Sequence, residues 1–199
     1  MIPDMILRPK AKNELGRRVF LLTMVGAAIT FGASLILPRY NGIVQLVALV
    51  LLCASLYFYT RYVASTYSYE VTTDADGVGV FIVRQSAGTR STTHCRMTLS
   101  SLVRAQKLDM QQMKLYRKNR KSKHKDGGAQ DGAPEYLCPA PDVGFYDYCV
   151  TLCPTEATLL CFRSRMERAD LLVEISEEFA TVLTRAAEQE RVFLEQGEL

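Results

Sequence analysis

The chain has no tryptophan and only two histidines among its 199 residues, and the residue patterns of common catalytic sites are missing as well. It contains no glycine-rich phosphate loop, dinucleotide fingerprint, serine elbow or H-E-x-x-H pattern. His94 lies in a threonine-rich segment and His124 in a basic one. No set of residues offers a nucleophile, a base and an oxyanion site together, so we expect no enzyme activity, no catalytic residue and no cofactor.

Closely spaced cysteine pairs are also missing. No C-x-x-C pair occurs among Cys138, Cys149, Cys153 and Cys161, whereas a structural zinc site usually takes two close pairs of ligands. We therefore expect no metal site, and we expect buried free thiols instead.

Charged residues are missing from two long stretches near the N-terminus. Residues 19–37 and 43–59 contain no Asp, Glu, Lys or Arg. About twenty helical residues, each rising about 1.5 Å, cross a bilayer core of about 30 Å. The short segment between the stretches is long enough only for antiparallel neighbours. The sequence therefore predicts a two-helix transmembrane hairpin over residues 19–64.

Two other interpretations of these stretches stay open. A buried helical pair in a soluble core usually shows some polar face, and these stretches are apolar all round. A cleaved signal peptide would end at a small-residue cleavage site, which is missing, and a second span follows at once. Within the stretches, Ala28-x-x-x-Gly32 is a small-residue step that either packs the hairpin on itself or supports self-association. Gln45 is expected to form an interhelical hydrogen bond.

The distribution of positive charge predicts an orientation. Basic residues are retained on the cytoplasmic side of a membrane. The segment between the two stretches carries Arg39 alone. The segment 1–18 carries five basic residues: Arg8, Lys10, Lys12, Arg17 and Arg18. We expect a multi-pass protein of the cell membrane with both termini in the cytoplasm. Residues 65–199 would then be a cytoplasmic domain, large enough for its own core.

The remaining chain indicates strands first and a helix last. Alternating apolar residues predict strands over 67–73 and 78–85, with a turn at 74–77, and a threonine-rich strand follows over 89–97. A weakly marked strand is expected over 105–116, and a β-hairpin is expected from 145–153 and 157–162. From residue 167 the apolar spacing becomes helical, at Leu171, Leu172, Ile175, Phe179, Val182, Leu183 and Ala186.

A strongly basic segment interrupts the predicted strands. It has no acidic residue and carries seven basic ones: Lys114, Arg117, Lys118, Arg120, Lys121, Lys123 and Lys125. With the turn-rich residues after it, it predicts a disordered loop at about 115–137. These seven residues are candidates for contact with a partner or with anionic lipid headgroups, which attract each charge by about 1 kcal/mol. A merely solvated loop is the alternative. Nucleic acid is not expected, because Tyr116 alone could stack on a base.

Several of these features together resemble a known family. They are the opening strand Tyr69–Asp74, the turn at Gly77, the step Thr98-Leu99-Ser100-Ser101-Leu102 and a closing helix from Glu167. With two preceding spans they resemble bacterial two-span membrane proteins that carry a PH-like cytoplasmic domain, including the YcxB-like group. The resemblance implies an α+β fold, in which a small PH-like β-barrel or sandwich is capped by a C-terminal helix. It also implies binding or assembly at a membrane, without chemistry.

Two functions follow as hypotheses. The first is a membrane-anchored, non-enzymatic binding or scaffolding protein that presents its PH-like domain to a protein or to anionic lipid. The second is an accessory or regulatory subunit of a membrane transporter or secretion complex. The partner in the membrane would be an unknown protein or a second copy of the chain.

Overall fold

The computed structural model describes residues 4–9, 13–36, 41–126, 142–164 and 168–197. Its elements follow in chain order. They are β1 Met5–Leu7, α1 Glu14–Ile36, α2 Asn41–Phe58 with the π-helical turn η2 Tyr59–Val63, β2 Ser65–Thr73, β3 Gly79–Ala87, β4 Arg90–Thr98, the 3₁₀ turn η3 Leu99–Ser101, β5 Leu102–Asp109, α3 Met110–Asp126, β6 Gly144–Asp147, β7 Glu156–Arg163, β8 Arg168–Val173 and α4 Glu177–Gly197. The predicted α+β class, with two apolar helices in the N-terminal region and a helix last, is confirmed, although the strand β1 precedes the apolar helices and was not predicted.

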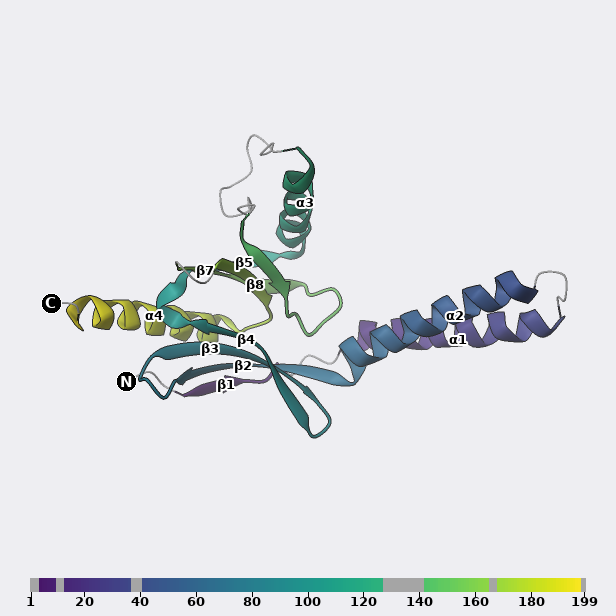
Figure 1. The fold of residues 1–199 in the computed structure, drawn as a ribbon, viewed down its shortest axis with the longest axis horizontal. Coiled ribbons are helices and arrows are strands. Elements are labelled where there is room, and N and C mark those ends of the chain that lie inside the picture. Colours follow the sequence, from purple (N-terminus) through teal and green to yellow (C-terminus); the bar gives the residue numbers. More distant parts are fainter. Residues whose placement is uncertain (1–3, 10–12, 37–40, 127–141, 165–167, 198–199) are drawn as a thin grey trace.

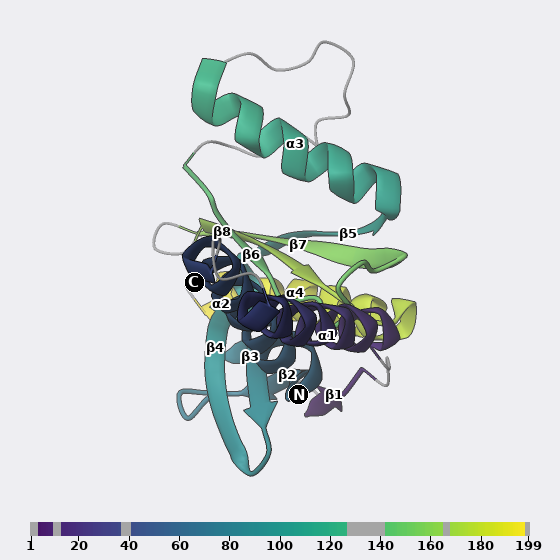
Figure 2. The same ribbon diagram turned by 90° about the vertical axis from the view of Figure 1, so that its right-hand side faces the viewer.

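The helices α1 and α2 lie side by side and project away from the rest of the molecule (Figures 1 and 2). Both are long and apolar enough to cross a membrane. Small residues form the contact between them. Ala27 and Ser34 of α1 are buried, as are Ala48 and Ser55 of α2. Each pair is spaced by seven residues, which is the repeat of helices that wrap around one another.

The two helices come very close at the end nearest the strands. A Cβ atom added to Gly16 would lie 2.8 Å from the Cβ of Tyr62. Only glycine fits at this point, because any side chain would have to push η2 away. The small residues of the α1–α2 contact therefore set the distance between the helices along their full length.

The first sheet is an antiparallel meander in the order β1-β2-β3-β4. Its first turn is as the sequence predicts. Gly77 adopts a φ of 80° and its N–H donates to the Asp74 carbonyl oxygen at 3.0 Å. Gly88 adopts a φ of 61° in the tight turn between β3 and β4. A glycine is needed at both places, because other residues rarely adopt positive φ. The edge strand β1 comes from before α1, and Met5 pairs with Val71 of β2.

The second sheet has the order β5-β7-β8-β6, and β6 pairs with β8 in parallel. The predicted hairpin of 145–153 with 157–162 is therefore wrong. β7 pairs instead with β5 and β8, and residues 148–155 form a loop. The Glu174 carboxylate accepts hydrogen bonds from the backbone N–H groups of Val150 and Thr151, at 2.9 and 3.0 Å. These N–H groups therefore have a hydrogen-bond acceptor although the loop does not pair with a neighbouring strand.

The main core fills the space between the two sheets and α4. Its large buried side chains include Tyr69, Phe81, Phe162, Leu171 and Phe179. The predicted closing helix begins at Glu177, ten residues later than expected, because residues 168–173 form β8. Leu171 packs in this core and the next residue, Leu172, packs in a second cluster beneath α3. Such an apolar pair is compatible with one face of a helix and with the two sides of a strand. Here the pairing of β8 with its neighbours makes the segment a strand.

The basic segment is helical, which corrects the expected loop at about 115–137. The expected strand over 105–116 ends at Asp109, and α3 follows at once. Asp109 and Gln112 form a capping box. The Gln112 N–H donates to Asp109 Oδ1 at 2.7 Å, and the Asp109 N–H donates to Gln112 Oε1 at 3.1 Å. Met113 and Tyr116 bury one side of the first turns in the second cluster. Residues 127–137 of the expected loop lie outside the described residues.

Candidate functional site

The helix α3 carries all seven basic residues predicted as a contact site. It covers the outer face of the second sheet, on the side opposite α4, and its axis runs crosswise to the axes of α1 and α2 in both views (Figures 1 and 2). One long side of α3 is therefore turned toward the surroundings of α1 and α2, at the ends of these two helices that are next to the sheets.

A buried hydrogen bond fixes α3 to the sheet beneath it. The Tyr116 hydroxyl donates to the carboxylate of Asp170 in β8, and burial raises the pKa of this hydroxyl well above its ordinary value. Asp170 is 1% exposed. Its other carboxylate oxygen accepts a bond of 2.6 Å from Arg163 Nη2. The negative charge of Asp170 is therefore balanced by Arg163 and held in place by two donors.

Two of the seven predicted contact residues serve the fold. Arg117 forms an ion pair with Asp147 of β6. The Arg120 guanidinium donates to the Val143 carbonyl oxygen at 3.3 Å and lies 5.1 Å from the centre of the Phe145 ring. Both arginines are half-buried. Their charges are engaged within the molecule and are only partly available to a ligand.

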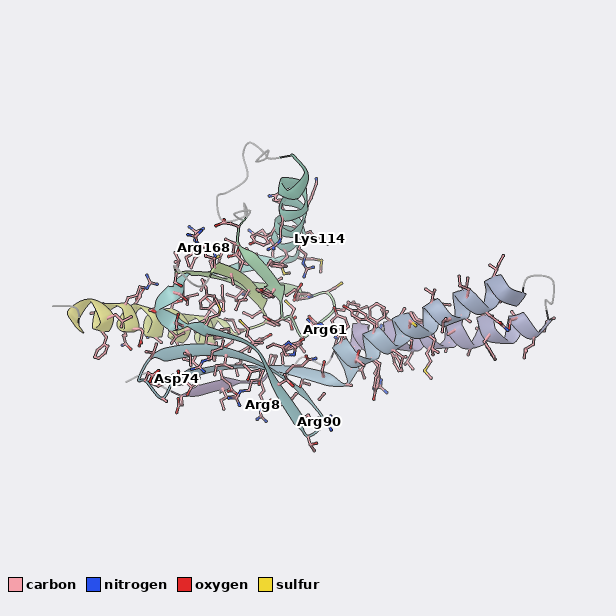
Figure 3. All side chains as sticks on the ribbon, viewed as in Figure 1. Arg8, Arg61, Asp74, Arg90, Lys114 and Arg168 are labelled. Carbon is pink, nitrogen blue, oxygen red and sulfur yellow. The ribbon has the colours of Figure 1, made fainter. Side chains whose placement is uncertain are left out.

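The remaining basic residues of α3 differ in what the structure describes. Lys114 and Lys118 are exposed. Figure 3 places Lys114 on α3, on the side of the molecule from which α1 and α2 project. The side chains of Lys121, Lys123 and Lys125 lie outside the described part of the structure. The described contact surface of α3 is therefore centred on Lys114 and Lys118.

A second group of residues joins the α1–α2 pair to the sheets. Asn13 caps α1, since the Gly16 N–H donates to Asn13 Oδ1 at 2.9 Å. The Asn13 amide also donates to the Val150 carbonyl oxygen at 3.0 Å. At the end of α2, Arg61 Nη2 donates to the Asp147 carbonyl oxygen at 2.8 Å, and its guanidinium lies 4.6 Å from the centre of the Tyr67 ring. Sequence reasoning missed this junction, although an asparagine just before an apolar helix is a capping signal.

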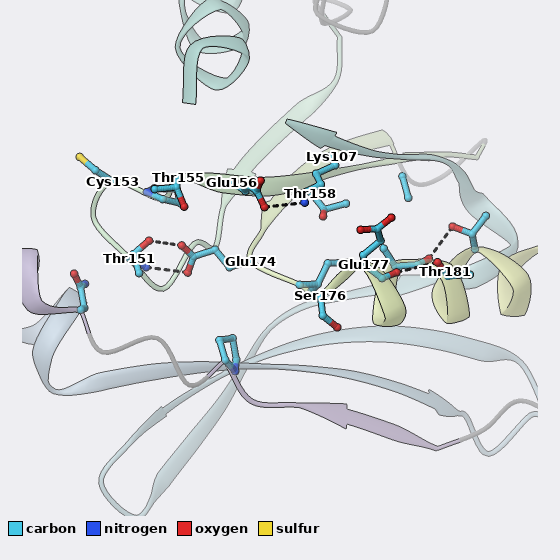
Figure 4. Close-up of a pocket in the computed structure, with 18 of the residues that line it drawn as sticks. Lys107, Thr151, Cys153, Thr155, Glu156, Thr158, Glu174, Ser176, Glu177 and Thr181 are labelled. Carbon is cyan, nitrogen blue, oxygen red and sulfur yellow. Dashed lines mark hydrogen bonds and ion pairs between the residues drawn. The ribbon is translucent and has the colours of Figure 1, made fainter. Parts of the chain in front are cut away.

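An open groove of about 940 Å³ lies between α4, the strands β5 and β7 and the loop 148–155, and it reaches the start of α1 (Figure 4). Some of its charged groups bind other groups of the protein. Lys107 forms a 2.7 Å ion pair with Glu156, which raises the pKa of Lys107. Glu174 binds the N–H groups of the loop and the hydroxyl of Thr151. The bonds of Glu174 fix the loop beside the end of β8, and the Lys107–Glu156 ion pair joins β5 to β7.

The described cysteines are all free. Burial raises the pKa of Cys149 well above its ordinary value and that of Cys161 to about 12, so both thiols keep their protons at neutral pH. Among the residues that the structure describes, no three His, Cys, Asp or Glu side chains are grouped as metal ligands. Cys138 lies outside those residues.

The Ala28-x-x-x-Gly32 step of α1 does not face α2. It would have to face α2 if it packed the hairpin on itself. Ala28 is exposed and Gly32 is half-buried, and a Cβ atom added to Gly32 would meet nothing within 4 Å. The prediction that Ala28 packs the two helices on one another is wrong, since its neighbour Ala27 does so. The other interpretation, self-association through Ala28 and Gly32, stays a prediction.

Comparisons with protein-family models, with curated proteins and with solved structures found no match. The fold alone defines the class of the protein. It is an α+β protein with two stacked four-stranded sheets, a C-terminal helix, and two N-terminal apolar helices that could span a membrane.

Proposed function

We propose that the protein is a membrane-anchored, non-enzymatic binding protein. The α1–α2 pair spans the bilayer as a hairpin and holds a PH-like domain at the cytoplasmic face. There the domain binds a partner protein or anionic lipid. The two layers of strands with a C-terminal helix support the PH-like assignment, and the basic residues before α1 support the cytoplasmic orientation.

One observation carries the anchoring part of this proposal. Residues before α1 and residues after α2 build the same domain, since β1 is an edge strand paired with β2 and Asn13 binds the loop 148–155. The segments that flank the α1–α2 pair must then lie on one side of the membrane. Two antiparallel spans meet this requirement, and a single span does not.

The position of α3 supports the lipid-binding part. A helix that lies crosswise to two spanning helices runs along the membrane plane rather than into it. Lys114 and Lys118 are exposed on such a helix, and each charge near an anionic surface contributes about 1 kcal/mol of attraction. Because Arg117 and Arg120 are engaged within the domain, we expect a weaker attraction than seven free charges would give.

A second function is favoured by a specific observation. The exposed position of Ala28 leaves a small residue of α1 facing outward, where a helix of another membrane protein could approach closely. This arrangement suits an accessory subunit of a transporter or secretion complex. Crosslinking from Ala28→Cys to one large membrane protein would support this function.

The anchoring is tested by fractionation and by a topology reporter. We expect the full-length chain to stay with membranes after alkaline carbonate extraction, and a reporter fused after residue 199 to be active only in its cytoplasmic form. A control chain without residues 14–63 should lose the membrane association. Recovery of the intact chain in the aqueous fraction, or a reporter active outside the cell, would contradict the proposal.

A further inference from the structure

We propose that the end of the β3–β4 hairpin, residues 87–94, binds the phosphate groups of anionic lipid beside the α1–α2 pair. We call these residues the β3–β4 tip. The surface is separate from α3, and the inference rests on the proposed spanning of the membrane. Its partner is the surface of the bilayer.

The strand register fixes the position of the β3–β4 tip relative to the end of α2. β2 begins at Ser65, with only Ala64 between it and η2, and it runs away from the α1–α2 pair (Figure 1). Ser65 pairs with Ala87, and Ala87 pairs with Arg90. Neighbouring strands lie about 4.8 Å apart. The hairpin therefore turns at the level at which the chain leaves the spanning segment.

The aromatic residues near the end of α2 indicate where that level lies in a membrane. Tyr57, Tyr59 and Tyr62 follow one another closely, and tyrosine is enriched where hydrocarbon meets headgroups. Each headgroup layer is about 5–8 Å deep, because the whole bilayer measures about 40–45 Å and its core about 30 Å. Ser65 follows Tyr62 by three residues. The β3–β4 tip beside Ser65 is therefore at the level of the headgroups.

The β3–β4 tip stands apart from the packed part of the domain. β4 is an edge strand of its sheet, and His94, between Thr93 and Cys95, has no paired residue in β3. Such a bulge bends its strand, and every residue of the tip is exposed. In Figure 2 the β3–β4 hairpin and α3 lie on opposite sides of the α1–α2 pair. The tip would thus give the domain a lipid contact on the side that α3 does not reach.

The side chains of the β3–β4 tip suit a phosphate ligand. Residues 77–108 contain no Asp or Glu, so no carboxylate of the hairpin repels an anion. Arg84 and Arg96 are paired with carboxylates of β2 and of the turn after it, whereas Arg90 has no ion pair with any residue that the structure describes. Figure 3 places Arg90 at the end of the hairpin, on the side from which α1 and α2 project. Exposed hydroxyl groups add further donors, and they belong to Thr89, Ser91, Thr92 and Thr93.

The first test compares the two ends of β3 for their distance from lipid. Full-length protein with Cys53→Ser, Cys138→Ser and Cys153→Ser is reconstituted in nanodiscs that contain quencher-labelled lipid. A fluorophore is attached at Thr89→Cys, in the tip, or at Asp76→Cys, in the turn at the other end of β3.

The two labelled positions are a matched pair. Both are exposed, and a strand of nine residues separates its ends by about 26 Å. We expect strong quenching at position 89 and little at position 76. Equal quenching at the two positions, or stronger quenching at position 76, overturns the proposal.

The second test measures the preference of the tip for anionic lipid. The quencher is carried either by phosphatidylglycerol or by phosphatidylcholine in nanodiscs of the same composition, and the ratio of quenching at position 89 gives the local enrichment of the anionic lipid. One free charge near the bilayer should give an enrichment of about fivefold. Arg90→Gln should abolish this enrichment.

Arg96→Gln is the matched control for Arg90→Gln. It removes an arginine of the same strand whose charge is already paired with Asp74, so the enrichment at position 89 should not change. An equal loss in the two variants overturns the proposal, and so does quenching at position 89 without any preference for anionic lipid.

The same samples separate a failure of the tip from a failure of the anchor. Each variant is first extracted from membranes with alkaline carbonate. A chain that leaves the membrane contradicts the proposed anchoring. A chain that stays in the membrane with position 89 unquenched contradicts the lipid contact of the β3–β4 tip alone.

Discussion

The side-chain amide of Asn13 donates a hydrogen bond of 3.0 Å to the carbonyl oxygen of Val150, across 137 positions of sequence. The same side chain caps α1 through its oxygen atom. One residue thus ends the segment before the apolar helices and binds the loop that follows β6. The α1–α2 pair is therefore fixed to the sheets at a defined position by hydrogen bonds.

Asn13→Ala should reduce the stability of the full-length protein in detergent. The cap contributes about 1 kcal/mol and the hydrogen bond to Val150 contributes about 1 kcal/mol, so the expected loss is about 2 kcal/mol. Asn13→Ser is the control, because serine can cap α1 but is too short to reach Val150. It should recover about half of the loss in a thermal or denaturant unfolding experiment. Equal stability of all three proteins would show that the junction contributes nothing.

Replacing Lys114 and Lys118 with Gln should weaken the approach of α3 to anionic lipid. The readout is a fluorophore on Gln111→Cys, at the start of α3, in full-length protein with Cys53→Ser and Cys153→Ser, reconstituted in nanodiscs that contain quencher-labelled lipid. We expect stronger quenching with anionic than with zwitterionic lipid, and a loss of this difference in the double variant. Each removed charge should cost about 1 kcal/mol at low salt, and salt should reduce the effect. Identical quenching in the two lipids would remove lipid binding from the proposed function.

Asp170→Asn should destabilise the domain more than Asp142→Asn. Both carboxylates pair with an arginine, but Asp170 is buried and also binds Tyr116, whereas Asp142 and Arg168 are more than half exposed. We expect a loss of about 1–3 kcal/mol for Asp170→Asn and of less than about 1 kcal/mol for the exposed pair. Parallel urea titrations of the two variants measure this. A larger loss for Asp142→Asn would contradict the assigned role of the buried pair.

The cysteines should react with an alkylating reagent in a fixed order. Cys153 is exposed, whereas Cys149 is buried and Cys161 is half-buried with its pKa raised to about 12. The thiolate is the reactive form, so Cys153 should be modified first at pH 8, and the other two only on unfolding. Mass spectrometry of peptides after timed alkylation gives the order. Early modification of Cys149 would show that the second cluster opens readily.

The same two thiols should make stability fall at alkaline pH. A free thiol in an unfolded chain loses its proton at about pH 8.5, whereas burial keeps Cys149 and Cys161 protonated in the folded protein. As the pH rises past that value, the unfolded chain releases protons that the folded one retains, and unfolding becomes more favourable. Denaturant midpoints measured from pH 7 to pH 10 should fall. In a Cys149→Ala and Cys161→Ala double variant they should fall less.

Most of the first half of the chain could be predicted from sequence because its signals are local. Two stretches without charged residues gave the apolar helices. The turn at Gly77 indicated where β2 ends and β3 begins, and Gly77 has the positive φ that such a turn requires. β2, β3 and β4 follow one another along the chain and pair with one another, so neighbouring patterns were enough for them. The strand β1 was not predicted, because its partner β2 lies beyond both apolar helices.

The second half could not be predicted in the same way, because its pairing is not local. β6 pairs with β8 rather than with β7, which follows it in sequence. Short apolar runs such as Leu171-Leu172 fit a strand or a helix equally well. The helix α3 did carry a readable signal, the capping box of Asp109 and Gln112, but its high charge suggested disorder.

The candidate contact site was predicted as a set of residues and not as a surface. Which of the basic residues remain exposed depends on Asp147 and Val143, which are distant in sequence and meet α3 only in the folded protein. The junction at Asn13 and Arg61 was missed for the same reason. Both of its binding partners, Val150 and Asp147, lie more than eighty positions further along the chain.

The pairing of β1 with β2 also orders events during synthesis. Residues 5–7 leave the ribosome well before their partners at 69–71, which appear only after both apolar helices have been made. The first sheet is therefore completed only after the whole α1–α2 segment has been made. A bulky tag at the N-terminus would interfere at this late step, whereas a tag after α4 would leave it undisturbed.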